Sequence, residues 1–501
     1  MAMHVLTLDQ GTSSLKAALW REDGVVLAEA LEAYELSRPA PTWAEIDPAR
    51  WWDALCTATR AVLAQAAVAA DDVACVALDG IGWTLVATDA DLRPVVPAMT
   101  WLDRRAEAEA EALRARPDAE TLVDLDANRI DAAYLTPKVA WLAGHRPDAF
   151  DATRWLLTAS GWLVARLTGE VTCDLTQAYG FHCFDLRRER WDEATAASLG
   201  IPLDRLPPIK RAGHVAGGMT HAAAFETGLS AGIPVIVGGL DAAMGALGGG
   251  VTRPGLTQDQ GGSAGGFAIS VTGVVVEPRL IFSHHVLEGQ YLLQAGTVGG
   301  GSLGWLRRIV GADEASFEAL ISLADDVPAG AHGVMFLPYM AGERTPLWSS
   351  APRGVFAGLS YATTRADLVR AVLEGSAFAN VDNLRIAQER GHRVTTWLGQ
   401  GGASRSATWN QIKADATGVA PRPPGRGRVG GWHGARAVRA RGARAAGLAG
   451  SPAETVERLL VQRTTLDPGP GPPRAIPGAV RRVARDFAAM LRQFDRLAGA
   501  A

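Results

Sequence analysis

The sequence predicts an α/β protein with two large domains. The chain has 501 residues, which is too many for one compact core. Strand-like apolar runs alternate with helical segments and Gly-rich turns. Each half opens with strands around a polar, Gly-rich turn, a hint of duplicated architecture that is too weak to define a repeat. We therefore expect an N-terminal domain at 1–245 and a C-terminal domain at 246–501.

The expected elements follow from apolar patterning and turn residues. Residues 4–9 and 15–20 are apolar runs on either side of the turn GTSS, so they predict two strands joined by a tight turn. In the rest of the first half, the patterns predict a helix at 49–69, a buried strand in DVACVALDG, a charged helix at about 106–114, two helices within 136–170 and a buried strand at 233–239. In the second half, they predict strands alternating with Gly-rich turns in GLTQDQGGSAGGFAIS and QYLLQAGTVGGG, and a long amphipathic helix at 366–390.

Composition narrows the class of protein. Hydrophobic residues make up 48% and charged residues 20%, as in globular proteins, and the net charge is −4. That charge gives no whole-chain attraction to nucleic acid or to an anionic membrane. The 4 cysteines form no CxxC pair, which fits a reducing cytoplasm and argues against a structural zinc site. With no signal-peptide pattern and no apolar run of about 18 residues, we expect a cytoplasmic protein without a membrane partner.

One stretch, residues 419–446, differs from the rest. It contains seven Arg, no Lys and no acidic residue, and shows neither helical nor strand periodicity. Because an unpaired buried guanidinium costs several kcal/mol, we expect this stretch to be a basic, flexible surface loop.

The turn between the first two strands is a candidate phosphate cradle. The chain has no GxxxxGK[ST] P-loop. In DQGTSSLK, backbone N–H groups and hydroxyls can face one concavity, Lys16 adds positive charge, and Asp9 at the strand end can hold Mg²⁺ directly or through water. An ordinary Gly-containing hairpin explains the turn equally well if it is taken alone.

Two further segments carry candidate carboxylates. Asp241 follows a buried strand, where it would face the crevice in which α/β proteins bind ligands and could accept a proton from a substrate hydroxyl. It is equally a candidate N-cap for a helix at 242–248. Trp101 and Asp103 form a candidate sugar site, since an aromatic face stacks on sugar CH groups and a carboxylate binds hydroxyls. A helix start capped by Asp103 is the alternative.

Two Gly-rich segments in the second half are less specific. Residues 261–266 read as a second phosphate turn, but they also match G-x-S-x-G, which would make Ser263 a hydrolase nucleophile. Residues 299–304 match the G-x-G-x-x-G of dinucleotide folds. Chance matches are expected in a chain with 56 Gly. The hydrolase interpretation lacks a convincing His partner, and the dehydrogenase interpretation lacks a clear βαβ unit.

Together, and in this order, the motifs resemble the FGGY carbohydrate kinase family, which includes xylulokinases, gluconokinases and glycerol kinases. The resemblance covers about residues 4–418, and its most specific part is FLPYMAGERTPLWSSAPRGVFAGLS with RAVLEG. It implies two actin-like, ribonuclease-H-like domains with a central cleft that close over ATP-Mg²⁺ and a sugar.

The resemblance also implies roles for individual residues. Asp241 would be the general base, Asp9 would be the metal-associated carboxylate, and Trp83, Trp101 and Asp103 would face the sugar. The implied phosphate and nucleotide contacts are Thr12, Ser13, Lys16, Gly261, Gly262, Ser263, Gly301, Gly401, Gly402 and Ser406.

The sequence departs from the family pattern in three places. Gly262 stands where the family usually has Thr, and Gly82-Trp83-Thr84 stands where xylulokinases show Met-His-Gly, which argues against xylulose itself. Residues 419–446 replace an Ala/Gly-rich helix, and family-like sequence resumes at GLAGSPAETVERL. Since Arg and Gly dominate out-of-frame readings of GC-rich coding DNA, we interpret the stretch as a local double frameshift.

These observations lead to one main expectation and two alternatives. The main one is an ATP- and Mg²⁺-dependent kinase of a small sugar, sugar acid or polyol, with no nucleic-acid partner and with a homodimer as one possible assembly. The first alternative is a homologue that binds sugar or nucleotide but is catalytically impaired, because 419–446 damages the adenine side. The second is a serine hydrolase that uses Ser263.

Overall fold

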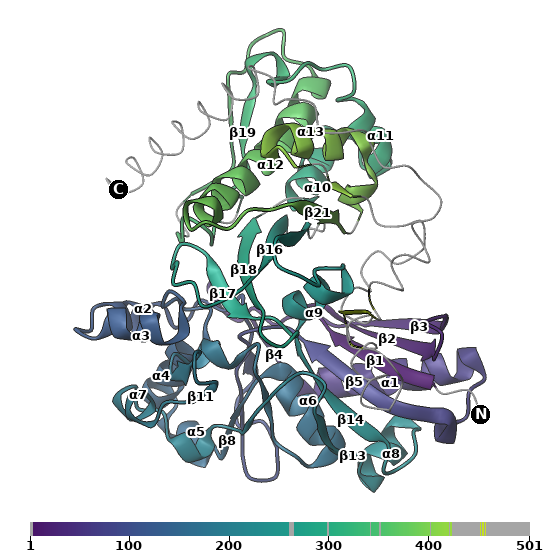
Figure 1. Ribbon diagram of the computed structural model, residues 1–501, viewed down its shortest axis with the longest axis vertical. Helices are drawn as coiled ribbons and strands as arrows, with labels where there is room; N and C mark the ends of the chain where they lie inside the picture. Colours follow the sequence, from purple (N-terminus) through teal and green to yellow (C-terminus); the bar gives the residue numbers. More distant parts are fainter. Residues whose placement is uncertain are drawn as a thin grey trace. The chain divides into compact units, whose positions relative to one another are not determined.

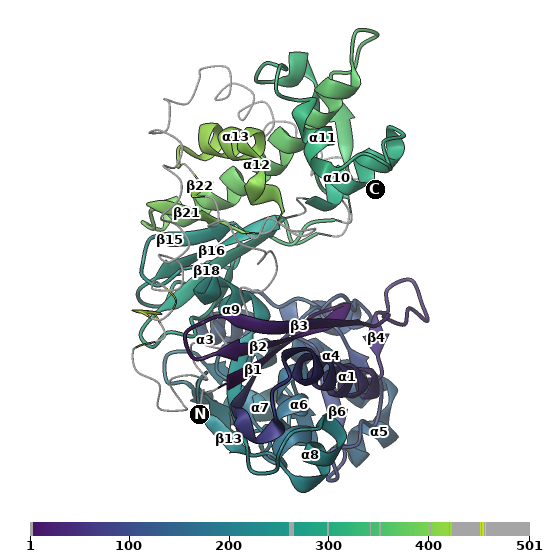
Figure 2. The same cartoon turned by 90° about the vertical axis from the view of Figure 1, so that its right-hand side faces the viewer.

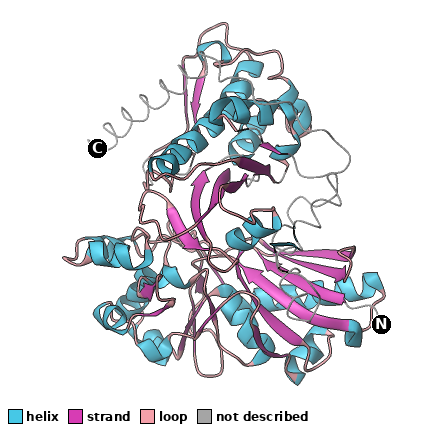
Figure 3. Cartoon of the chain, viewed as in Figure 1, coloured by secondary structure: helices cyan, strands magenta, loops and turns pink. Residues whose placement is uncertain are grey.

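The computed structural model describes residues 4–259, 265–297, 300–340, 342–349, 352–400, 402–419 and 421–422, and residues 451, 453, 454 and 456. The chain forms two compact units. Within the described ranges, the first unit contains residues 4–248, Ser283–Gly289 and residues 451, 453, 454 and 456, and the second contains Gly249–Phe282 and residues 290–422. The division falls within β17 (Ile281–His284), which is described with the second sheet because it pairs there. Each unit combines one six-stranded sheet with helices (Figure 3), so the expected two-domain α/β fold is confirmed.

The sheet of the first unit has β1 at its centre and the strand order β13-β14-β5-β1-β2-β3 (Figure 1). Its strands are β1 (His4–Gln10), β2 (Ser14–Arg21), β3 (Val26–Ala33), β5 (Val73–Gly80), β13 (Val215–Gly218) and β14 (Pro234–Leu240). β1 runs antiparallel to β2 and parallel to β5, and β5 runs parallel to β14. The carboxyl ends of β1, β5 and β14 therefore lie at one edge of the sheet.

One face of this sheet is covered by α1 (Pro48–Ala66), α6 (Ala159–Thr168) and α8 (His221–Thr227). Leu8, Leu15 and Leu78 belong to the core on that face, together with Trp51 and Trp162 from the helices. Figure 2 shows α1 lying along β2 and β3. Because side chains alternate along a strand, the neighbours of these leucines project from the opposite face.

The remaining elements of the first unit are short and surround this core. They are β4 (Glu45–Ile46), β6 (Val86–Thr88), β7 (Ala98–Met99), α2 (Glu107–Arg114), α3 (Ala119–Asp126), α4 (Leu135–His145), α5 (Pro147–Ala152), β8 (Trp155–Leu157), β9 (Cys173–Asp174), β10 (Phe184–Asp185), β11 (Arg190–Trp191), α7 (Glu193–Ser198), β12 (Ile209–Lys210) and α9 (Asp241–Gly248).

Five strands of the sheet in the second unit repeat the pattern of the first, whereas the sixth strands, β13 and β17, extend opposite ends of that pattern. Its order is β17-β18-β16-β15-β21-β22. β15 runs antiparallel to β16 and parallel to β21, β16 runs antiparallel to β18, and β21 runs parallel to β22. β15 thus occupies the place that β1 has in the first sheet. The elements of this unit are β15 (Leu256–Asp259), β16 (Gly265–Val271), β17 (Ile281–His284), β18 (Tyr291–Thr297), α10 (Gly300–Ile309), α11 (Phe317–Ser322), β19 (Met335–Leu337), β20 (Val355–Ala357), α12 (Arg365–Glu389), β21 (Thr396–Gly399), α13 (Ala407–Thr417) and β22 (Pro421–Arg422).

Most long elements match the sequence-based expectations closely. The helices expected at 49–69, 106–114 and 366–390 are α1, α2 and α12. The expectation of two helices within 136–170 is wrong, since α4, α5 and α6 occupy this range with β8 between the last two. The breaks have local causes, because Pro147 begins α5 and the Thr158 hydroxyl caps α6 by accepting from Gly161 N.

The Arg-rich stretch 419–446 lies mostly outside the described residues. Its early residues Pro421–Arg422 form β22 beside β21, which corrects the expectation that the stretch contains no strand. None of the helices in the described ranges combines the length and apolar character that crossing a membrane requires.

Candidate active site

The polar turn after β1 is a compact, hydrogen-bonded connection between two strands. Gly11 N donates to Ser14 O at 2.9 Å, and the Tyr34 hydroxyl donates to Gly11 O at 2.6 Å. Thr12 is half-buried and Ser13 is exposed, so their hydroxyls lie at the edge of the sheet. The expected arrangement of strand, tight turn and strand is confirmed.

Asp9 and Lys16 face each other across the first two strands. They are register partners, and Lys16 Nζ lies 2.9 Å from Asp9 Oδ2. Burial acts to lower the pKa of Lys16, but the attraction of the Asp9 carboxylate outweighs it, so the pKa stands above its ordinary value. Asp79 and Asp241 act in the same direction as Asp9. Lys16 therefore keeps its positive charge at this strand end.

A second carboxylate, Asp79, lies beside Asp9 on the neighbouring strand β5. The two residues are partners in the parallel register, so their side chains leave the same face of the sheet. Asp79 is fully buried, and neither of its carboxylate oxygens has a hydrogen-bond partner among the described residues. Burial raises its pKa well above the ordinary value, and the nearby charges of Asp9 and Asp241 raise it further.

Sequence reasoning missed Asp79, although a signal was present. Residues 73–80 read correctly as a buried strand, and the carboxylate near its end was left without a role. Asp241 was chosen as a candidate because it follows a buried strand. The same criterion, applied to VACVALDG, selects Asp79.

Asp241 completes a row of three carboxylates at the ends of parallel strands. It is the first residue of α9, directly after β14, and is partly exposed. Its Oδ1 accepts a hydrogen bond from Ala242 N at 2.7 Å, so it also supports the start of the helix. The interpretations as strand-end carboxylate and as helix-start residue are therefore compatible. Its charge acts on Lys16 and Asp79, which places it in the same electrostatic group.

Trp101 connects the polar turn to the proposed sugar side. Its indole Nε1 donates to Thr12 Oγ1 at 3.0 Å, and the ring is partly exposed. Trp83 is buried, with its ring centroid 4.6 Å from that of Tyr134 and 6.0 Å from that of Tyr179. Of the two tryptophans, Trp101 is the more accessible to a ligand.

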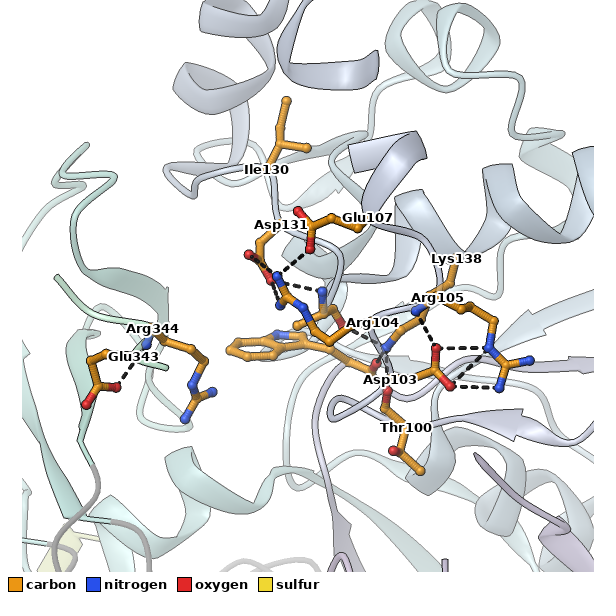
Figure 4. A network of polar contacts seen from close by, with 12 residues as sticks. Thr100, Asp103, Arg104, Arg105, Glu107, Ile130, Asp131, Lys138, Glu343 and Arg344 are labelled. Atoms are coloured by element: carbon orange, nitrogen blue, oxygen red, sulfur yellow. Dashed lines mark hydrogen bonds and ion pairs between the residues drawn. The ribbon is translucent and has the colours of Figure 1, made fainter. Parts of the chain in front are cut away.

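Asp103 is engaged by protein donors on both of its oxygens. It is fully buried and accepts from Ala44 N at 2.7 Å. It also accepts from the backbone and the guanidinium of Arg105 (Figure 4). Arg105 in turn stacks over Trp43, with its Cζ 3.6 Å from the ring centroid. These contacts make Asp103 an organiser of the segment around residues 100–105, and they leave it without a free oxygen for a sugar hydroxyl.

Lys138 fixes three segments through their backbone and was not singled out from the sequence. Its Nζ donates to Trp83 O at 2.6 Å, to Thr100 O at 2.7 Å and to Ala133 O at 2.7 Å, and the side chain is fully buried. Figure 4 labels Lys138 and Thr100 of this group. Burial acts to lower the pKa of Lys138 to about 7, whereas three carbonyl acceptors favour the ammonium form. An available signal was its position on the apolar face of α4, which also buries Val139 and Leu142.

The predicted nucleotide-side residues belong to the second unit. Gly301 lies in the first turn of α10, and Gly402 is exposed before the short 3₁₀ helix Ala403–Arg405. Ser406 caps α13, where its Oγ accepts from Trp409 N at 3.1 Å. The other predicted residues of this side, Gly261, Gly262, Ser263 and Gly401, lie outside the described residues.

The dinucleotide-fold interpretation of residues 299–304 does not agree with the strand directions. The strand that precedes α10 is β18, and it runs antiparallel to β16 over its whole length. A dinucleotide-binding motif begins from a strand of a parallel βαβ unit. The glycines of α10 are thus part of a different arrangement.

Comparisons with known proteins agree with this geometry. The model of the FGGY family of carbohydrate kinases matches with its N-terminal domain at residues 4–248 and with its C-terminal domain at residues 270–440. The xylulose kinase of Escherichia coli is 30% identical over 414 residues, which is 82% of this chain and 84% of that protein. The autoinducer-2 kinase of Klebsiella pneumoniae is 31% identical over 443 residues, 84% of this chain and 82% of that protein.

A solved structure extends the likeness to the fold. The crystal structure of xylulose kinase from Rhodospirillum rubrum matches with a TM-score of 0.86 and 30% identity, covering 99% of this chain and 100% of that one. The two repeated sheets are consistent with the actin-like, ribonuclease-H-like fold expected from the sequence. Family match, sequence identity and fold lead to the same conclusion: this chain belongs to the FGGY family of carbohydrate kinases.

Proposed function

We propose that this carbohydrate kinase transfers a phosphoryl group from ATP to a hydroxyl of a small sugar, sugar acid or polyol. The observation that supports this most directly is the row formed by Asp9, Asp79 and Asp241 with the single ammonium of Lys16. Phosphoryl transfer depends on positioning and on balancing charge around the transferred group. Even with Asp79 neutral, the carboxylates of Asp9 and Asp241 outnumber the ammonium of Lys16, and this excess of negative charge suits a metal cation that carries phosphate ligands.

Distinct roles are proposed for Asp241, Lys16 and Asp9. Asp241, the partly exposed carboxylate, accepts the proton of the substrate hydroxyl. Lys16 and the hydroxyls of Thr12 and Ser13 contact the phosphates. These groups come from one turn whose backbone is fixed by hydrogen bonds, so their positions are set before a ligand binds.

Asp9 is the proposed carboxylate for Mg²⁺. No set of three or more His, Cys, Asp or Glu side chains in the described ranges is arranged to hold a metal ion by itself. That fits Mg²⁺, which proteins often bind through one or two carboxylates together with water and substrate phosphates. When bound there, Mg²⁺ would neutralise charge that develops on the phosphoryl oxygens.

The proposed substrate contacts are made by Trp101 and Trp83. Asp103 is proposed to hold the segment around residues 100–105 in place. The relatives named above act on xylulose and on autoinducer-2, so family membership leaves the acceptor open. The chain also carries Gly82-Trp83-Thr84 in place of the Met-His-Gly triplet of xylulokinases. We therefore assign the acceptor as a class, namely small sugars, sugar acids and polyols.

The nucleotide side is proposed to be formed by Gly261, Gly262, Ser263, Gly301, Gly401, Gly402 and Ser406. The replacement of a family helix by residues 419–446 supports a second candidate, a homologue that binds ligands but turns over slowly. The proposed setting is the cytoplasm, where ATP is available.

A coupled ADP-release assay over ketoses, aldonates and polyols tests the proposal. We expect ADP release to rise with at least one acceptor, and Asp241→Asn to lower kcat by about 10²–10⁴-fold while ATP binding is retained. ATP binding without acceptor-dependent ADP release would favour the impaired homologue. A wild-type turnover rate in the Asp241→Asn variant would contradict the role of Asp241. Labelling of Ser263 by a fluorophosphonate would favour the hydrolase alternative.

A further inference from the structure

The backbone that carries Asp241 departs from regular strand geometry at the end of β14. The parallel register with β5 shifts between Val237 and Leu240. A Cβ placed on Gly238 would lie 2.0 Å from Leu78 O, and one on Gly239 would lie 2.9 Å from Thr176 Oγ1. The strand end is thus pressed against two neighbours, and side chains are excluded from both glycine positions.

The Thr176 hydroxyl holds this irregular strand end. Leu240 N, one residue before Asp241, donates to Thr176 Oγ1 at 2.7 Å, and the bond is buried. Thr176 Oγ1 in turn donates to Asp174 Oδ1 at 2.5 Å. Since the hydroxyl proton is directed to Asp174, a lone pair of the oxygen is left for the Leu240 N–H.

Asp174 is itself fixed on its second oxygen. Gln177 Nε2 donates to Asp174 Oδ2 at 2.7 Å and to Ser160 Oγ at 3.0 Å, which ties the group to α6. Asp174, Thr176 and Gln177 are all buried. Burial raises the pKa of Asp174 to about 6, while the hydrogen bonds from Thr176 and Gln177 act to lower it. A buried, charge-assisted chain of this kind is rigid.

We propose that Thr176 and Asp174 are positioning residues that fix the position and orientation of the Asp241 carboxylate. The inference rests on the proposed function, because it assumes that Asp241 acts on the substrate hydroxyl. The chain from Asp174 through Thr176 to Leu240 N ends one peptide unit before Asp241, at the point where the strand register is already broken. A displacement of about 1 Å in a reacting group can lower a rate by about 10²-fold. We therefore expect the loss of the hydrogen bond between Leu240 N and Thr176 to lower kcat.

The matched pair Thr176→Val and Thr176→Ser isolates the hydroxyl. Valine keeps the shape but loses both hydrogen bonds, whereas serine keeps the hydroxyl and loses only a methyl group. We expect kcat for an accepted sugar to fall about 10–100-fold in Thr176→Val and to stay within about three-fold in Thr176→Ser. KM for ATP should change little in both, because the proposed phosphate contacts lie in the turn after β1.

A double-mutant cycle distinguishes positioning from a general structural role. If Thr176 acts through Asp241, adding Thr176→Val to Asp241→Asn should lower kcat no further than Asp241→Asn alone. Multiplicative losses in the double variant would overturn the inference, as would equal kcat values in Thr176→Val and Thr176→Ser. Either result leaves the proposed kinase activity standing. A wild-type protein without acceptor-dependent ADP release would remove the proposed function and this inference with it.

Asp174→Asn provides a second route if Thr176→Val fails to fold. Asn keeps an acceptor for the Thr176 hydroxyl, but it can place an amide NH₂ against that of Gln177. We expect an intermediate loss of kcat, about 3–30-fold, with KM for ATP unchanged. A wild-type kcat in this variant, together with unchanged folding, would contradict the inference.

Discussion

The two sheets share the arrangement of five strands around β1 and β15, but the acids at the ends of these two strands are balanced differently. The central strand of each ends near an aspartate, Asp9 in β1 and Asp259 in β15. The parallel neighbour of Asp9 in register is Asp79, whereas the parallel neighbour of Asp259 is Gly399. Asp259 forms an ion pair with Lys413 from α13, and both side chains are buried.

This difference separates a structural use of a buried acid from a functional one. In the second unit the acid at this edge is matched by a buried ammonium, which is the condition under which a buried charge is tolerated. In the first unit three acids share the partly exposed Lys16. Strongly perturbed groups of this kind concentrate at functional sites. The comparison therefore concerns the acids themselves: Asp259 is neutralised within the fold by Lys413, whereas the acids at the edge of the first sheet are left for the proposed ligand site.

The largest effect is expected from Lys413→Met. It leaves Asp259 buried without its counter-ion, and we expect a loss of about 3–5 kcal/mol in the free energy of unfolding. Urea unfolding followed by tryptophan fluorescence measures it, with Trp397 and Trp409 as reporters in this unit. The matched variant is Lys16→Met, which should lose much less stability but most of the kinase activity. The reverse ranking of the two stabilities would break the comparison.

Asp79→Asn should increase stability, because it removes a buried carboxyl without a hydrogen-bond partner among the described residues. We expect the free energy of unfolding at pH 8 to rise, since the raised pKa means that the ionised form of Asp79 is disfavoured in the folded protein. Asp259→Asn, the matched change in the second unit, should instead destabilise. If Asp79→Asn and Asp259→Asn shift stability in the same direction, the buried acids of the two sheets do not differ in how they affect folding.

The advantage of Asp79→Asn should depend on pH. The folded-state pKa of Asp79 is raised, so its neutral form is favoured in the folded protein, and stability is lost as pH rises above the unfolded-state pKa. The difference in Tm between Asp79→Asn and wild type should therefore be larger at pH 8 than at pH 5. A difference that grows as pH falls would contradict the assignment of a raised pKa.

The smallest effect is expected at an exposed ion pair on the first sheet. Arg21, the last residue of β2, pairs with Asp23 at 2.6 Å, and both side chains are close to half exposed. Asp23→Asn should leave the urea unfolding midpoint almost unchanged, because solvent and salt screen such pairs. A loss as large as that of Lys413→Met would show that burial does not control these energies.

The sequence predicted elements whose signals are local. The turn between β1 and β2, the strand β14 and the helix α12 were readable because apolar periodicity and turn residues lie within a few positions of each other. The candidate carboxylates Asp9 and Asp241 were readable for the same reason, since each lies at the end of an apolar run.

Features that depend on distant partners were not readable. Asp103 suggested a ligand-binding carboxylate, but its donors Ala44 N and Arg105 are known only from the fold. The bond from Leu240 N to Thr176 spans 64 positions, and no periodicity in one sequence reports such a contact. The apolar face of α4 hinted that Lys138 is buried, but its acceptors Trp83 O and Thr100 O are 55 and 38 positions away and are known only from the fold.

The contacts of Lys138 also bear on how substrate preference can diversify within this architecture. The ammonium holds carbonyl oxygens at positions 83, 100 and 133, and every amino acid carries a carbonyl oxygen. Replacing Trp83 with another residue would therefore change the ring packing without removing the acceptor that anchors its backbone. The backbone arrangement can therefore stay the same while the side chains at these positions change and bind a different sugar or polyol.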